Sequence, residues 1–483
     1  MDQFPGKAPH FITSDHHFHR DMPVALRIRD YSENSDLLHS HEFHELVLVL
    51  GGIGVYIVRY IEHGAEWATF AANSSVYTSG VLSTGTLTDR SGVVLATANG
   101  GSRSYADDAA VRTACYQAVG DYTGNVGTGA LKAFSKQLSG YNPITGTYAT
   151  DGHTVALTLD SSLCVTAYEA LAGRKGAVLV SNYKTGEILC MVSAPSFDPL
   201  SPPEDIETNA AYSGAYVNRF LSSAMTPGSI FKCVTLTAAL EQIDDLSERT
   251  WTCTGSVQIG ADTVTCPSAH GELDIESAFA KSCNCVFGQL ATELGAETME
   301  KYTKKAGLTA RYDVDGIQTA AGSFVFDDAE QNDLAWAGVG QGQDTVNPCA
   351  MMVYMGAVAN GGRAAVPQLI QSVKTPAGLP TSFSFSKTTG RLIEKDTAAA
   401  LADMMANNVS VIYGTKRFPG MDICAKSGTA EVGDGKAAHG WFVGFLNDEE
   451  HPYAFVCLVE NGGSGLGAAG SVINTVLQAA VAK

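Results

Sequence analysis

The sequence predicts an α+β fold in which an antiparallel sheet is flanked by helices, with a separate all-helical lobe and a small preceding domain. After residue 150, strand-like runs lie towards both ends and helical runs lie between them. The 483 residues suffice for two or three domains, and a hydrophobic content of 45% supports a substantial core. The net charge of −19 argues against nucleic acid as a partner, because binding it normally requires a basic face.

The elements are expected in a simple order. Residues 62–150 mix short β-like runs with Gly-, Ser- and Thr-rich turns and one helical stretch, Asp107–Val119, which predicts a small domain. Residues 151–483 are expected to form the larger domain. Its expected helices are Ser161–Leu171, Ile230–Ile243, Glu272–Leu294 with an interruption near Ser282–Asn284, Asn347–Asn360, Asp396–Asn407 and Ala468–Ala482, and its expected strands are Ala177–Ser181, Glu187–Ser193, Cys424–Val432, His439–Leu446 and Ala454–Glu460.

Ser229 and Lys232 form an S-x-x-K motif at the start of a helix. The run Ile230–Ile243 is apolar nearly all round, so it predicts a buried helix, in which a lysine is costly unless it is paired or functional. Ser229 lies three residues earlier and therefore on the same face. Burial lowers the pKa of a lysine towards neutrality, so its free amine can take the proton of a serine hydroxyl. The pair predicts a serine nucleophile and its base.

Two further motifs follow in the chain, Ser282-Cys283-Asn284 and Lys426-Ser427-Gly428-Thr429. S-x-x-K, S-D-N and K-T-G together are the signature of class A β-lactamases and penicillin-binding proteins. The S-C-N and K-S-G-T found here resemble the penicillin-binding transpeptidase variants of the second and third elements.

About residues 60–483 resemble the class B penicillin-binding proteins. Beyond the three motifs, the resemblance rests on a segment similar to the start of their pedestal domain, a segment similar to the first hairpin of their transpeptidase domain, and three short glycine-containing runs. These are Gly85–Ala96, Gly176–Pro199, Gly338–Gly342, Asn360–Gly362 and Gly440–Phe445. The resemblance implies a β-lactamase/transpeptidase-like fold over residues 151–483 and a pedestal over residues 62–150.

The resemblance also implies a peptidoglycan D,D-transpeptidase that works through a serine acyl-enzyme and that β-lactams inhibit covalently. Ser229 would attack the stem peptide and Lys232 would be the general base. Ser282 would relay a proton to the leaving amine with Lys426 polarising it, and Asn284 would hold the substrate backbone.

The K-S-G-T segment is expected to be an edge strand to which the acyl chain adds. Gly428 would allow the close approach, and the hydroxyls of Ser427 and Thr429 suit the terminal carboxylate. The N–H groups of Ser229 and Thr429 would form the oxyanion hole. No cofactor or metal is expected at the site.

The implied partners are peptidoglycan stem peptides, lipid-linked glycan strands, β-lactams and a membrane glycosyltransferase. Two alternatives use the same residues: a D,D-carboxypeptidase, which passes the acyl group to water, and a non-enzymatic β-lactam sensor or scaffold. A class A β-lactamase is disfavoured, because Glu272 and Glu276 precede Ser282 whereas the deacylating glutamate of that class follows its S-D-N element.

Lys184-Thr185-Gly186 spells K-T-G literally but lies between two β-rich runs and precedes the nucleophile. We therefore interpret it as the turn of a hairpin.

The 11 cysteines are odd in number and include no C-x-x-C knuckle, which argues against both a complete disulfide framework and a zinc site. Cys253 and Cys266 bracket a β-like excursion and are candidates for a pair. Cys283 and Cys285 are interpreted as small buried thiols.

Residues 46–61 are a candidate membrane anchor, which would place the catalytic domain outside the cytoplasm on a single-pass protein. The uniformly apolar run over residues 46–58 is shorter than the ~20 residues that a span prefers, and the preceding flank lacks a positive charge excess. His39–Glu45 with residues 46–52 resembles the first strand pair of a cupin, as in sugar-responsive transcription regulators. Residues 1–45 are therefore interpreted as an N-terminal extension, a truncated cupin-like remnant.

Overall fold

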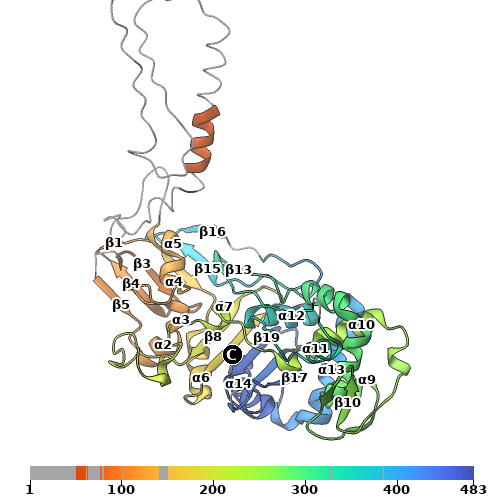
Figure 1. Ribbon diagram of the computed structural model, residues 1–483. Coiled ribbons are helices and arrows are strands. Elements are labelled where there is room, and N and C mark those ends of the chain that lie inside the picture. Colours follow the sequence, from red (N-terminus) through yellow and green to blue (C-terminus); the bar gives the residue numbers. More distant parts are fainter. Residues whose placement is uncertain are drawn as a thin grey trace, which may run out of the picture. The chain divides into compact units, whose positions relative to one another are not determined.

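The computed structural model describes residues 51–60, 63, 77–78, 81–99, 102–140, 151–326, 329–383, 386–433 and 435–482 (Figure 1). The chain divides into two compact units. One comprises Met1–Phe70 with Tyr141–Gly146, and the other comprises Ala71–Gly140 with Thr147–Lys483.

In the smaller unit, residues 51–60 form a helix on which large apolar side chains are exposed, among them Val55 and Val58. No helix among the described residues is both long enough and apolar enough to cross a membrane. The N-terminal extension and the first five residues of the candidate anchor lie outside the described residues, as do most of the cupin-like residues. Residues 51 and 52, the end of that cupin-like stretch, are helical.

The larger unit is built on a five-stranded sheet in which every neighbouring pair is antiparallel, as predicted. All five strands are rich in buried apolar residues, which is typical of a sheet covered on both faces. In order across the sheet they are β17 (Ile423–Ala430), β18 (His439–Leu446), β19 (Tyr453–Val459), β7 (Gly176–Asn182) and β8 (Ile188–Ala194).

Helices cover this sheet. α12 (Pro348–Ala359) packs on β18 and β19, and it is buried all round because its residues are apolar on every side. α6 (Ser161–Leu171) packs on β8 and against α14 (Ser471–Val481). α14 buries a single stripe of apolar side chains, as expected for a helix with one solvent-facing side. The α+β prediction is therefore confirmed, and the bounds predicted for α6 and β18 are those observed.

A helical lobe lies beside the sheet. Its helices are α8 (Lys232–Gln242), α9 (Ile275–Ala280), α10 (Asn284–Lys305), α11 (Gln331–Gly338) and α13 (Lys395–Asn408). The predicted interruption near residue 282 separates α9 from α10, whereas α11 was not predicted. Two small antiparallel strand pairs join α8 to α9. β9 (Trp251–Cys253) pairs with β12 (Gly271–Leu273), and the hairpin of β10 (Ser256–Ile259) and β11 (Asp262–Thr265) lies between them in the chain.

A second, six-stranded sheet draws on three separate parts of the chain. Its order is β16 (Pro380–Phe383), β15 (Ile370–Lys374), β6 (Thr154–Leu157), β3 (Gly85–Thr88), β4 (Val94–Asn99) and β5 (Ser102–Tyr105). The boundary predicted at residue 150 therefore runs through a shared sheet. Short helices cover this region: α2 (Ala109–Ala114), α3 (Tyr116–Val119), α4 (Ala130–Ala133) and α5 (Ser135–Ser139).

The remaining elements are short. They are β1 (Tyr77–Thr78) with β2 (Val81–Leu82), β13 (Asp313–Val314) with β14 (Ile317–Gln318), and α7 (Arg219–Ser222).

Asp344 is a buried carboxyl that the fold solvates poorly. Its side chain is 2% exposed, and Oδ2 has no hydrogen-bond partner among the described residues, while Oδ1 accepts one long bond of 3.4 Å from the Val325 N–H. Burial raises the pKa of Asp344 to about 7.

We predict that Asp344→Asn stabilises the protein at pH 8 but not at pH 5. The folded state binds the Asp344 proton more tightly than the unfolded state, because the pKa of this carboxyl is raised on folding. The resulting stabilisation is complete below the unfolded pKa and is lost as pH rises through the folded pKa of about 7. Because one pKa unit corresponds to about 1.4 kcal/mol, the variant should gain at least about 1 kcal/mol on the wild type between the two pH values. Denaturant unfolding measures this, with the exposed Asp333→Asn as control. An equal effect of Asp344→Asn at both pH values would contradict the prediction.

Candidate active site

Ser229 lies in a single 3₁₀ turn, Gly228–Ile230, that runs directly into α8. Gly228 has a φ of 56°, which favours glycine, and its N–H donates to the Gly340 carbonyl at 2.8 Å. A Cβ at Gly228 would lie 2.7 Å from the carbonyl oxygen of Thr429. The Pro-Gly-Ser sequence therefore lets the nucleophile turn lie directly against strand β17.

Lys232 lies beneath this turn, and its side chain is 0% exposed. Its Nζ is 3.0 Å from Ser229 Oγ, 2.7 Å from the Ser282 carbonyl oxygen and 2.7 Å from Asn284 Oδ1. The last two atoms can only accept hydrogen bonds. A neutral amine that donates its two N–H bonds to them keeps its lone pair for the Ser229 hydroxyl. The contacts thus accommodate the neutral amine that a general base requires, with its lone pair directed at the Ser229 hydroxyl.

The orientation of the Asn284 amide follows from its surroundings. Its Nδ2 donates to the Thr265 carbonyl at 2.8 Å, an atom that can only accept, so Oδ1 is the atom that faces Lys232.

The pKa of Lys232 is well below the usual lysine value, because burial penalises its charged form and the nearby Lys426 repels a second positive charge. Burial also lowers the pKa of Lys426, to about 8. Among the described residues, no carboxylate forms an ion pair with either lysine. In this site, therefore, neither solvent nor a carboxylate among these residues stabilises the charged form of either amine.

Ser282 connects the two lysines. Its Oγ lies 3.1 Å from Lys232 Nζ and accepts a hydrogen bond of 3.0 Å from Lys426 Nζ. Ser282 occupies the break between α9 and α10 with a φ of 55°, a conformation that costs a non-glycine residue energy. Such strain persists where the surrounding structure enforces it, and it is concentrated at functional sites.

Strand β17 forms one wall of the site and is an edge strand, as predicted, because it pairs only with β18 within its sheet. On its free edge, Ser427 N–H donates to the Tyr413 hydroxyl at 2.8 Å and the Thr429 carbonyl accepts from Gln341 Nε2 at 3.3 Å. Gly428 faces the nucleophile turn, since a Cβ there would lie 2.9–3.2 Å from atoms of Pro227 and Ile230. Thr429 is exposed and Ser427 is half-buried, so an extended ligand can reach this edge.

All eight residues predicted from the three motifs meet in this region. Ser229, Lys232, Ser282, Asn284 and Lys426 form one connected set of contacts, and Ser427–Thr429 continue along β17. Gln341 and Tyr413 were missed. Gln341 lies within the Gly338–Gly342 run, whose sequence indicates no specific role, and no local pattern marks Tyr413.

The literal K-T-G lies at the other end of the sheet. The strand register aligns Thr429 with Gly440, Val459 and Gly176, at the start of β7. Lys184 lies beyond the other end of that strand, after Asn182 and Tyr183. The N–H groups of Lys184 and Thr185 donate to Asn182 Oδ1, which forms a turn. Its interpretation as a hairpin turn is confirmed.

Residues 176–478 match the family described as the penicillin binding protein transpeptidase domain. The chain belongs to this family. The match covers the five-stranded sheet, the helical lobe and all three motifs, and it begins at the first residue of β7.

Among relatives, the chain is 29% identical over 328 residues to peptidoglycan D,D-transpeptidase PbpA of Mycobacterium tuberculosis, and the alignment covers 64% of this chain and 66% of that protein. It is 25% identical over 371 residues to peptidoglycan D,D-transpeptidase MrdA of Acinetobacter baumannii, covering 66% of this chain and 53% of that one. The chain thus spans just under two thirds of the length of PbpA and about half of the length of MrdA.

Among solved structures, the D,D-transpeptidase domain of a peptidoglycan glycosyltransferase from Eggerthella lenta superposes with a TM-score of 0.72 at 29% identity, covering 83% of this chain and 98% of that one. The penicillin G acyl-enzyme complex of penicillin-binding protein A from M. tuberculosis superposes with a TM-score of 0.69 at 24% identity, covering 83% and 99%. The second likeness concerns the fold alone.

We predict that Lys232→Ala slows acylation by a fluorescent penicillin at least about a thousandfold, because removal of the base in a nucleophile–base pair costs nearly as much as removal of the nucleophile. Lys184→Ala, in the exposed turn, is the matched control and should leave the rate unchanged. The second-order rate constant of labelling measures both. A larger loss in Lys184→Ala than in Lys232→Ala would mean that the motifs have been misassigned.

We predict that the acylation rate rises with pH as Lys232 loses its proton, and that Lys426→Gln moves this rise to higher pH. The positive charge of Lys426 helps to lower the pKa of Lys232, so its removal must raise that pKa. The pH profile of the residual rate separates this effect from a simple loss of rate. An unshifted profile in the variant would show that Lys426 does not set the protonation of Lys232.

Proposed function

We propose that this protein is a serine-type peptidoglycan D,D-transpeptidase that β-lactams acylate at Ser229. The observation that carries the proposal is the amine of Lys232, which is fully buried, lies 3.0 Å from the Ser229 hydroxyl and contacts the same Ser282 hydroxyl as Lys426. Membership of the transpeptidase family and the names of the relatives PbpA and MrdA support the same chemistry.

In the acylation step, Ser229 Oγ attacks the carbonyl carbon of the penultimate D-alanine of a stem peptide, and its proton passes to Lys232 Nζ. The backbone N–H groups of Ser229 and Thr429 are proposed to receive the oxyanion, with each donor contributing roughly 2.7–4 kcal/mol. Collapse of the tetrahedral intermediate breaks the peptide bond and leaves an ester on Ser229.

The leaving amine of the terminal D-alanine needs a proton. Ser282 Oγ contacts both amines, so it can pass a proton from Lys232 to the leaving group while Lys426 stabilises the hydroxyl oxygen. In the second step an amine of a neighbouring stem attacks the ester by the reverse path. This step forms the cross-link and restores the Ser229 hydroxyl.

Substrate binding is proposed along the free edge of β17. A stem peptide that adds as an extra strand would place its backbone against Ser427–Thr429, with Gly428 permitting the close approach to the nucleophile turn. The hydroxyls of Ser427 and Thr429 suit the terminal carboxylate. Because the whole chain carries a net charge of −19, the attraction for that carboxylate must be local, and Lys426 is the cation of this wall.

We also propose that residues 46–61 anchor the protein in the cell membrane with the enzyme outside the cytoplasm. The exposed apolar side chains of the helix over residues 51–60 support this. Residues 62–150 would then be a pedestal, lipid-linked glycan strands would carry the stems, and a membrane glycosyltransferase would be the partner. Residues 1–45 remain interpreted as an extension. Loss of membrane association on deleting residues 1–61 would test the anchor.

We predict that the detergent-solubilised protein links a D-Ala-D-Ala peptide to an added amine acceptor, and that Ser229→Ala abolishes both this product and the mass increase of one penicillin equivalent. Only Ser229 carries the attacking oxygen, so no partial activity should remain. Mass spectrometry of products and of intact protein measures both.

The outcomes also separate the alternatives. Hydrolysis that the amine does not divert would identify a D,D-carboxypeptidase. Acylation without turnover of any stem peptide would identify a β-lactam sensor or scaffold. An adduct on a residue other than Ser229 would overturn the site itself.

A further inference from the structure

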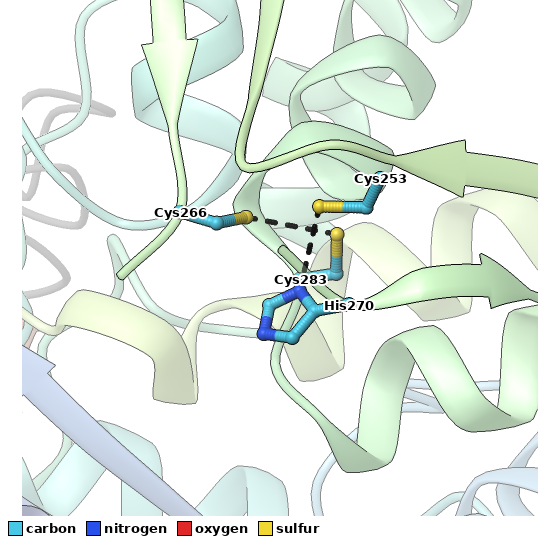
Figure 2. A group of neighbouring side chains, drawn as sticks. All are labelled: Cys253, Cys266, His270 and Cys283. Carbon is cyan, nitrogen blue, oxygen red and sulfur yellow. Dashed lines mark hydrogen bonds between the residues drawn. The ribbon is translucent and has the colours of Figure 1, made fainter. Parts of the chain in front are cut away.

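Four side chains that can bind a metal ion converge next to the S-C-N motif. The ligand atoms of Cys253, Cys266, His270 and Cys283 all lie within 4.8 Å of one another. Figure 2 shows the three sulfur atoms and the imidazole pointing toward a common centre. They come from four places in the chain: the end of β9, the residue after β11, the residue before β12 and the junction between α9 and α10.

The distances fit a shared ion. Cys266 Sγ lies 3.7 Å from Cys283 Sγ, and Cys253 Sγ lies 3.5 Å from His270 Nδ1. A tetrahedral zinc ion with bonds of about 2.3 Å to sulfur and about 2.0–2.1 Å to nitrogen places two sulfur ligands about 3.8 Å apart and sulfur and nitrogen about 3.5 Å apart. A disulfide needs sulfur atoms about 2.05 Å apart.

The thiols of this group are not joined by a disulfide. Cys253 and Cys266, the pair suggested by the sequence, are both free cysteines. The structure therefore does not contain the candidate pair. Both side chains face the same centre, Cys253 from the end of β9 and Cys266 from the residue after β11.

Cys266 is poised to act as a thiolate. Its Sγ accepts hydrogen bonds from the backbone N–H groups of Asn284 at 3.1 Å and Cys285 at 3.4 Å, at the N-terminus of the long helix α10. Donors and a positive helix end stabilise a negative sulfur. Cys266 and His270 are each partly accessible to solvent, so an ion can enter.

We propose that the protein binds one structural zinc ion through Cys253, Cys266, His270 and Cys283. Three soft thiolates and one imidazole in a tetrahedral arrangement are the donor set that selects zinc over magnesium or calcium. Four protein ligands leave no open position for water or substrate. The ion is therefore structural and takes no part in bond breaking.

The ion would hold the catalytic loop in place. Cys283 lies between Ser282 and Asn284, and the Thr265 carbonyl, next to Cys266, accepts the hydrogen bond from Asn284 Nδ2. One ion bound to Cys266 and Cys283 would fix both sides of this contact and help to maintain the strained φ of Ser282. Cys283 is in this sense a positioning residue for the two motif residues beside it.

The β10–β11 hairpin would gain most from such a connection, because its buried apolar side chains belong to a small cluster. β10 and β11 contribute Ile259 and Val264 to a small separate cluster with Ala335. A segment of this size commonly relies on a metal or a disulfide for its stability.

The expectation of no zinc site rested on the absence of a C-x-x-C knuckle. Here three residues separate Cys266 from His270 along one loop. The other two ligands join them only when β9 pairs with β12 and α9 meets α10. The inference is independent of the proposed reaction, since it concerns metal content.

The test measures zinc in the full-length protein purified in detergent under reducing conditions. We expect about one zinc per chain by elemental mass spectrometry, retention in Ser229→Ala, and loss of at least nine tenths in Cys266→Ser and His270→Ala. Cys285→Ser is the matched control and should keep its zinc. Its Sγ lies 3.5 Å from Cys266 Sγ and 3.7 Å from the Val264 carbonyl oxygen, but Cys285 is not one of the four side chains whose ligand atoms converge. Zinc content that is low and equal in wild type and Cys266→Ser, or lost equally in Cys285→Ser, overturns the proposed ligand set.

A second measurement does not depend on variants that fail to fold. Replacement of zinc by cobalt should produce a thiolate-to-cobalt charge-transfer absorption in the wild type, and His270→Cys should retain the metal with a spectrum shifted towards that of a four-sulfur site. Absence of the charge-transfer band in the wild type overturns the proposal.

Chelation should slow penicillin acylation at least tenfold, and zinc but not magnesium should restore it. An unchanged rate in protein shown to be zinc-free would sink the positioning role. Ser229→Ala, which cannot be acylated, still reports metal content, so failure of the enzyme assignment is distinguishable.

Discussion

The amine of Lys232 is buried beside a second buried amine, and no carboxylate of the described residues pairs with either. This constraint organises the rest of the site. A positive charge on the Lys232 amine is unfavourable in this place, so the amine tends to be neutral, and a neutral amine can act as a base. The contacts from the Ser282 carbonyl and Asn284 Oδ1 then use its N–H bonds and leave its lone pair towards Ser229. In the proposed mechanism, low polarity and directed acceptors together replace the carboxylate–histidine pair of other serine enzymes.

Three parts of the fold form this arrangement, and each contributes a segment that lies outside regular helix or sheet pairing. The nucleophile turn depends on Gly228, the lobe contributes Ser282 from a strained break between helices, and the sheet contributes its free edge. The Cys/His cluster lies at the least regular of these places, because the break between α9 and α10 has neither a helix nor a strand to hold it. A metal ion is a compact way to fix a loop that secondary structure does not.

Much of the fold and site was predictable because the signals are local. The S-x-x-K motif, the apolar helix after it and the break at Ser282 are written in short stretches of sequence. The partners of β15 and β16 in the six-stranded sheet were not predictable, since pairing Ile370 with Leu157 is a choice between distant segments. The Cys/His cluster escaped for the same reason. Its ligands are brought together by the pairing of β9 with β12 and by the packing of α9 and α10, and no spacing rule contains that information. Tyr413 likewise reaches Ser427 only through the tertiary structure.

The contact between Gly228 and β17 limits how such a protein can evolve under antibiotic pressure. Any side chain at Gly228 or Gly428 would push Ser229 away from the strand on which we propose that the stem peptide binds. A drug that occupies the same edge cannot be excluded there without excluding the substrate. On this mode of binding, single substitutions that reduce drug binding are expected at residues such as Gln341, which touches the strand without lying between it and Ser229.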